Sequence, residues 1–221
     1  MRALVLFERS GRVRDAIRAK GHMAVSVDLE PSDAPGPHMV EDVDHLLVKH
    51  AAYVRSFDVV IAHPPCTYLT AAGVRWLYEY DREARRTVVD SNGDPVRDAD
   101  RWARMQADAI LFRRVLHVDV PRVAVENPRM HVHAATIVGR RQDQTVQPWQ
   151  FGHPEKKGTG FWLRGLPPLV PTHDVRHIMA TLPVQETDRV HRMAPGPERQ
   201  RLRSLTYPGI AAAIADQWVT P

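Results

Sequence analysis

The run Ala3-Leu-Val-Leu-Phe7 and the turn Glu8-Arg-Ser-Gly11 open the segment that most strongly indicates the fold of this chain. Five successive apolar residues predict a buried strand, and the turn after it contains the glycine that tight connections favour. The next residues, Val13 to Ala19, have the apolar spacing of a helix that is buried on one side. A strand, a turn and a helix in this order predict the first half of a parallel βαβ unit.

A second apolar run completes this unit. Gly21 ends the predicted helix, and Ala24 to Val27 form a second strand that finishes at Asp28. A glycine in the first turn and an acid at the end of the second strand are typical of a site that binds a nucleoside through its ribose hydroxyls. We therefore predict an α/β fold with a doubly wound, mostly parallel sheet.

Cys66 is the only cysteine of the chain, and it follows another predicted strand, Phe57 to Ala62. Because it cannot form an internal disulfide, two interpretations are open: a small apolar side chain in the core, or a nucleophile. Pro64 and Pro65 favour the nucleophile, because two prolines stiffen the end of the strand and would hold the thiol at a defined place.

A carboxylate occupies the same kind of position later in the chain. Arg122-Val-Ala-Val-Glu-Asn-Pro128 is a short β-branched run that ends in polar residues and a proline. Reactive groups gather outside the carboxyl ends of the strands in open parallel sheets. We therefore predict that Cys66 and Glu126 face one crevice. The alternative for Glu126 is an ordinary solvent-exposed acid in a loop or a neighbour of a helix N-cap.

The rest of the chain alternates helical and irregular patterns. We predict one helix from Val43 into Val54 and another from Trp102 to Leu116, where apolar residues recur at spacings of three and four. The stretch from Thr67 to about Asp100 is irregular, which indicates a functional loop or a disordered one. After Val125 prolines are frequent, so we predict loops and short strands up to a last helix, Ile210 to Trp218.

The charge of the chain is unevenly distributed. The 221 residues carry a formal charge of +4, and the segment from Gly139 to Arg203 contains eleven basic against six acidic residues. This excess favours a polyanionic partner for the C-terminal third. No segment reaches the roughly 18 apolar residues that span a bilayer, so we expect no membrane partner and a cytoplasmic location. His131 and His133 have no further ligands at useful spacing, so we expect no metal site.

Pro64-Pro-Cys66 after one strand and Glu126-Asn-Pro128 after a later one, behind the N-terminal βαβ unit, resemble motifs of the DNA cytosine-5 methyltransferases. The resemblance is closest to the small members carried by phages. Two later segments, Phe151-Gly-His-Pro-Glu155 and Tyr207-Pro-Gly-Ile-Ala-Ala-Ala-Ile-Ala215, are similar to segments of the same family in the same order, so the resemblance covers most of the chain.

This resemblance implies a fold, an organisation and an activity. It implies a Rossmann-like class I methyltransferase domain in residues 1–163, a small target-recognition region in 164–203, and a C-terminal helix in 204–221 that packs back on the catalytic domain. The implied reaction is methyl transfer from S-adenosylmethionine to C5 of cytosine in DNA. The implied base-binding and supporting residues are Pro65, Asn127 and Lys157, and the implied S-adenosylmethionine-binding residues are Phe7, Ser10, Gly11, Asp28, Leu29, Asp42 and Pro64.

The resemblance also implies a chemical role for each of the two reactive groups. Cys66 would add to C6 of the base as a thiolate, which makes C5 nucleophilic, and Glu126 would bind N3 of the same ring. Because the target atom lies inside the base stack of a duplex, the cytosine would have to be flipped out.

The chain departs from the family in three places. Glu8-Arg9 stands where the family has a glycine, Lys156-Lys-Gly-Thr-Gly160 replaces an Arg-x-Arg pattern, and the recognition region from about Arg164 to Gln200 is very short. We therefore expect short or relaxed sequence specificity. Two alternatives remain open: modification of cytosine C5 with another one-carbon donor or on a free cytidine nucleotide, and a nucleic-acid-binding module without catalysis.

Overall fold

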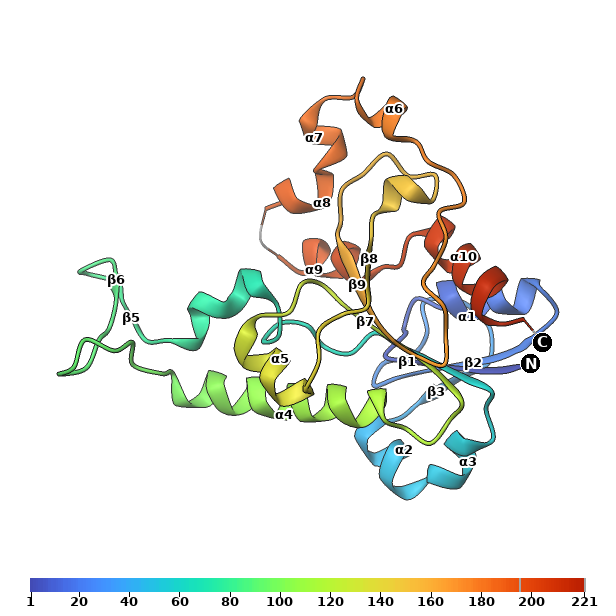
Figure 1. Ribbon diagram of the computed structural model, residues 1–221, viewed down its shortest axis with the longest axis horizontal. Coiled ribbons are helices and arrows are strands. Elements are labelled where there is room, and N and C mark those ends of the chain that lie inside the picture. The colour runs from blue at the N-terminus through green and yellow to red at the C-terminus, as the bar shows by residue number, and fades with distance from the viewer. Residues whose placement is uncertain (195, 221) are drawn as a thin grey trace.

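A seven-stranded sheet forms the centre of the computed structural model, which describes residues 1–194 and 196–220 (Figure 1). The strand order is β3-β2-β1-β4-β7-β9-β8. The first five strands of this order are parallel, and β9 runs antiparallel to both of its neighbours. The strands are β1 (Arg2–Leu6), β2 (Met23–Asp28), β3 (His38–Val40), β4 (Val59–Ala62), β7 (Arg122–Asn127), β8 (Gln144–Val146) and β9 (Thr159–Arg164).

Helices cover both faces of this sheet, which confirms the predicted doubly wound α/β class. Alternate residues of β1 belong to opposite cores, because successive side chains of a strand point to opposite faces. Ala3 and Val5 pack with one set of helices, and Leu4 and Leu6 with the other. The first face carries α1 (Arg12–Ala19) and α10 (Pro208–Trp218), which also pack on each other; the second carries α2 (Val43–Lys49), α3 (Ala51–Arg55), α4 (Ala99–Leu116) and α5 (Val132–Val138).

The predicted helix from Val43 to Val54 is interrupted. α2 and α3 are separated at His50, whose backbone angles of φ −120° and ψ 32° are not helical. Val43, Leu46 and Val54 are nevertheless all buried, so the apolar spacing continues across the break. Periodicity therefore predicted the buried face correctly and the continuity of the helix wrongly.

The region after Val125 contains more regular structure than predicted. β9 is a six-residue strand inside the main sheet, and its first five residues are buried. Phe161 packs edge-on against Trp218 at 5.2 Å between ring centroids, and Trp162 packs in the same way against Phe112 at 5.0 Å. Short helices follow: α6 (Arg176–Met179), α7 (Val184–Thr187), α8 (Arg189–Arg192) and α9 (Pro197–Ser204), with the 3-10 turn η2 (Pro148–Gln150) preceding β9.

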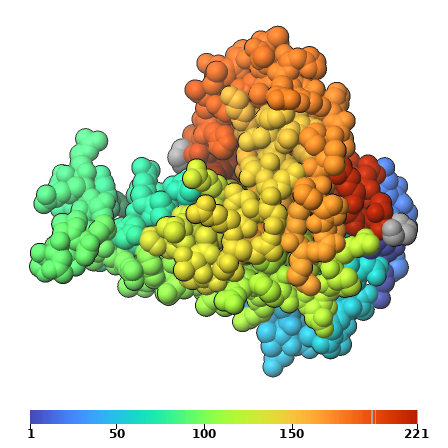
Figure 2. All heavy atoms as spheres, in the orientation of Figure 1, coloured from blue at the N-terminus to red at the C-terminus, as the bar shows by residue number. Residues whose placement is uncertain are grey.

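The predicted irregular stretch between Thr67 and Asp100 forms a projecting arm. It contains the 3-10 helix η1 (Ala71–Leu77) and the two-stranded hairpin β5 (Tyr80–Asp81) and β6 (Arg86–Thr87). The space-filling view shows this arm standing away from the body of the molecule (Figure 2). Residues 71–98 contain five arginines and six acidic residues, so the arm as a whole is not basic.

One half-buried acid of α4, Asp108, is expected to make the stability depend on pH. Burial alone raises the pKa of Asp108 to about 6, so the folded chain binds a proton at Asp108 more tightly than the unfolded chain. The resulting stability is present below pH 4 and is lost as the pH rises through about 6.

We expect Asp108→Asn to remove this loss. Its free energy of unfolding should exceed that of the wild type by about 1–3 kcal/mol at pH 8, after allowance for solvent screening, and should match it near pH 4. Urea unfolding at both pH values measures the difference. The exposed Asp119→Asn variant is the control, and an equal effect of the two substitutions would contradict the assignment.

Candidate functional site

The site begins at the point where the strand order reverses, between β1 and β4. Ligands of doubly wound sheets bind outside the carboxyl ends of the strands at such a point. Ala62, the last residue of β4, pairs with Leu6 on one side and Val125 on the other. The residues that follow these three, including His63 and Glu126, therefore gather at one edge of the sheet.

The structure places Cys66 and Glu126 within electrostatic reach of one another. Cys66 is partly exposed, and its pKa is raised first by burial and then by the negative charge of Glu126. Arg203 of α9 and Lys157, which precedes β9, act in the opposite direction. Segments distant in sequence therefore supply one thiol, one carboxylate and two cations to the same location.

Lys157 is held inside this cluster. Burial lowers the pKa of its ammonium group, while Glu126 and Cys66 oppose that shift. Its Nζ donates a hydrogen bond to the Leu205 carbonyl at 3.0 Å and lies 5.6 Å from the centre of the Tyr207 ring. Lys157, Glu126 and Tyr207 line a small cavity of about 10 Å³, which is smaller than a pyrimidine ring.

A much larger cavity of about 850 Å³ lies beside it. This volume is within the range of small-molecule sites. This cavity is lined by six residues that were predicted to bind the cofactor or the base: Phe7, Ser10, Asp28, Leu29, Asp42 and Pro65. Gly11 and Pro64 are buried and are not among its lining residues.

The lining of the large cavity is strongly acidic. The two arginines that line it are paired with acids: Arg9 with Glu30 and Asp33, and Arg201 with Glu198. Four more carboxyl groups line the walls: Glu8, Asp28, Asp42 and Asp44. Asp44 is paired with Arg114, and the other three leave an excess of negative charge that favours a cationic ligand.

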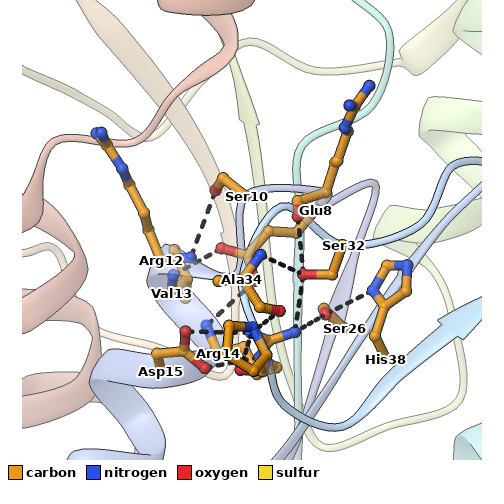
Figure 3. Close-up of polar contacts among 12 residues, drawn as sticks. Glu8, Ser10, Arg12, Val13, Arg14, Asp15, Ser26, Ser32, Ala34 and His38 are labelled. Carbon is orange, nitrogen blue, oxygen red and sulfur yellow. Dashed lines mark hydrogen bonds and ion pairs between the residues drawn. The ribbon is translucent and has the colours of Figure 1, made fainter.

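Glu8, which stands where a glycine was expected, has a structural function in the turn (Figure 3). Its carboxylate accepts hydrogen bonds from the backbone N–H groups of Val13 at 2.6 Å and Arg14 at 3.1 Å, at the start of α1. Such acceptors satisfy the free N–H groups of a helix N-terminus. Burial raises the pKa of Glu8, and the charge of His63 opposes this.

Arg14 is a buried cation that sequence reasoning missed. Its side chain is 0% exposed, and its guanidinium donates to the hydroxyls of Ser26 and Ser32, each at 3.1 Å. It also pairs with Asp15 and donates to the carbonyls of Ala34 and Pro35. Figure 3 shows these contacts tying α1, β2 and the following loop together. A charged residue next to Val13 on the apolar side of the helix was the available signal.

Gly11 is required by the same network. Its φ of 71° is left-handed, and a Cβ built there would lie 2.3 Å from Nη2 of Arg14. Both the backbone angle and the close approach therefore favour glycine.

Two further predicted residues make local contacts. Asp42 caps α2 by accepting from the His45 N–H at 2.9 Å while also lining the large cavity. Asn127 is fully buried and donates through Nδ2 to the Pro128 carbonyl at 2.8 Å. On β7 it follows Glu126 directly, so its side chain points to the opposite face of the sheet.

The chain is therefore a doubly wound α/β protein. A thiol, a carboxylate and an acidic cavity lie at the point where its strand order reverses. No family model and no curated protein matches the chain. Among the described residues, no helix is both long and apolar enough to cross a membrane, and no group of three His, Cys, Asp or Glu side chains could hold a metal ion.

Two solved structures are similar in fold. One is described as a DNA modification methyltransferase encoded within a prophage of E. coli, with 16% identity, a TM-score of 0.44, and coverage of 83% of this chain and 56% of that protein. The other is the Entamoeba histolytica methyltransferase EhMeth, with 12% identity, a TM-score of 0.48, and coverage of 79% and 57%. The chain thus spans a little over half the length of each. Because the sequence identities and TM-scores are this low, any functional conclusion has to come from the site residues.

The charge of Glu126 provides a test of the cluster that does not require an activity. Glu126→Gln removes one of the two main causes that raise the pKa of Cys66, so we expect that pKa to fall and alkylation by iodoacetamide at pH 7.5 to accelerate. Lys157→Met removes an opposing cation and should slow alkylation. Mass spectrometry over a pH series measures both rates, and equal rates in all three proteins would contradict the cluster.

Proposed function

We propose that this protein transfers a methyl group from S-adenosylmethionine to C5 of cytosine in DNA. The observation that carries the proposal is the convergence of Cys66 and Glu126 from neighbouring parallel strands, next to a large acidic cavity. A thiol and a carboxyl group at one edge of a sheet can contact two different positions of one pyrimidine ring.

Cys66 and Glu126 have complementary roles in this proposal. The sulfur of Cys66 forms a bond to C6 of the cytosine, and the electron pair of the C5–C6 double bond moves onto C5. Glu126 hydrogen-bonds N3 and stabilises the charge that develops in the ring. Loss of the C5 proton after methylation restores the double bond and expels the Cys66 thiolate.

The charged groups around Cys66 are consistent with a nucleophile that is activated when substrate binds. Burial and the Glu126 carboxylate raise the pKa of Cys66 in the free protein. Transfer of a proton to Glu126, or its hydrogen bond to the base, would reduce that negative charge and favour the thiolate. Lys157 and Arg203 already act in this direction.

The large cavity fits S-adenosylmethionine in size and charge. The cofactor supplies an electrophilic methyl group on a positively charged sulfonium. Asp28, at the end of β2, would bind the ribose hydroxyls, and Asp42 the adenine amine, while Phe7, Ser10 and Leu29 line the same space. Gly11 and Pro64 would shape the backbone behind it. The alternative with another one-carbon donor is less favoured by the acidic walls where that donor is anionic.

DNA is the acceptor that the C-terminal region favours. Basic side chains are exposed beside the small cavity and on the short helices, including Lys156, Arg189 and Arg192. We propose that residues 1–163 form the catalytic domain, that residues 164–203 contact the target strand, and that residues 204–221 pack back on the catalytic domain. The small cavity cannot hold a base as it stands, so entry of a flipped cytosine requires the Ser204–Tyr207 segment to move.

The test is a transfer assay with methyl-labelled S-adenosylmethionine. The protein is incubated separately with duplex DNA and with dCMP, and the products are digested and separated. Label in 5-methyl-deoxycytidine from DNA is the expected result, and affinity for DNA should fall steeply with added salt. Label only in dCMP would favour the free-nucleotide alternative, and binding of DNA without any transfer would favour the non-catalytic one.

A further inference from the structure

His63 lies beside Glu126 for a reason that follows from strand register. Ala62 of β4 pairs with Val125 of β7, so the next residues of these parallel strands project side by side. The His63 backbone N–H donates to the Leu6 carbonyl at 3.0 Å, which also attaches it to β1. Its Nδ1 lies 3.4 Å from Oε2 of Glu126, a long hydrogen bond.

Within residues 1–194 and 196–220, this is the one hydrogen bond that reaches the Glu126 carboxyl group. Lys157 lines the same small cavity, but its ammonium donates to the Leu205 carbonyl instead. The orientation of the carboxyl group that the proposed reaction needs at N3 therefore depends on His63.

The other ring nitrogen of His63 has no partner. The side chain is 9% exposed, and Nε2 is buried without a hydrogen bond among the described residues. His63 lines both the large acidic cavity and the small cavity, so its ring is part of the wall between them. An unpaired buried nitrogen costs free energy, and its position at this wall points to a ligand group as the missing partner.

We infer that His63 is a positioning residue, which holds Glu126 through Nδ1 and hydrogen-bonds through Nε2 to a substrate group at the boundary of the two cavities. This inference rests on the proposed function, because the aligned carboxyl group acts on the cytosine. No feature of the Cys66 or Glu126 motifs assigns a role to this histidine.

Two substitutions of His63 distinguish a positioning role from a packing role. His63→Phe keeps a planar ring and removes both nitrogens, and we expect it to lower kcat for methyl transfer by about 10²-fold, the effect of a misplaced catalytic group. The KM for S-adenosylmethionine should change little. His63→Asn can restore a polar atom near Nδ1 and should recover much of the lost kcat. A raised KM with normal kcat in the Phe variant, or no recovery with Asn, would overturn the inference.

A spectroscopic measurement tests the contact without any activity. Long-range ¹H–¹⁵N spectra of the histidine rings should show one Nδ1 resonance that shifts in Glu126→Gln and disappears in His63→Phe. An unchanged His63 ring in Glu126→Gln would show that the hydrogen bond is absent and overturn the inference. If the wild type transfers no methyl group, the proposed function fails, and these spectra alone decide whether His63 holds Glu126.

Discussion

Replacement of Cys66 by serine is expected to lower kcat for methyl transfer to DNA by at least about 10⁴-fold, as loss of a covalent nucleophile does in other enzymes. A hydroxyl in the same half-buried position ionises far less readily than a thiol, and Glu126 opposes a negative charge there. Binding of S-adenosylmethionine should be retained, because Cys66 is not among the residues that line the large cavity.

The measurement combines turnover with trapping. Duplex DNA containing 5-fluorocytosine should form a covalent complex with the wild type that survives denaturation, and none with Cys66→Ser. Isothermal titration with S-adenosylmethionine serves as the control for folding. Transfer by the serine variant within tenfold of the wild type would show that the thiol is a packing residue, which was the other interpretation of a lone cysteine.

Arg14→Ala is expected to reduce the free energy of unfolding by about 3–5 kcal/mol, the range for a buried charge network that loses one partner. The guanidinium is fully buried, and its removal takes one hydrogen-bond donor from each of the hydroxyls of Ser26 and Ser32 and opens a cavity next to α1. The loop that carries Asp33 to the large cavity loses its anchor, so affinity for S-adenosylmethionine should fall as well.

Arg18→Ala, an exposed arginine of the same helix, is the matched control and should change stability by less than about 0.5 kcal/mol. Urea unfolding measures both variants. Arg14→Lys tests the geometry, since an ammonium group keeps the charge but lacks the planar fork that reaches several acceptors. Full stability of the alanine variant would show that the network contributes little.

Apolar patterns in the sequence were sufficient to predict the strands that position the site. The apolar runs at Ala3–Phe7, Ala24–Val27 and Val123–Val125 correspond to β1, β2 and β7, because strands buried on both faces need continuous apolar residues. The break at His50 escaped prediction, because the apolar spacing continues across it. The prolines indicated loops and short strands in this region but not that β9 belongs to the main sheet, because its burial depends on β7 and β8 lying on either side.

Apolar patterns and flanking prolines are local properties of the chain, so they were enough to predict the strands, the thiol after one of them and the carboxylate after another. The surroundings of these two groups depend on how the chain folds in three dimensions. The register of β4 on β7 sets His63 against Glu126, and the return of the chain through α9 brings Arg203 toward Cys66. Such contacts join residues far apart along the chain, and no local pattern contains them.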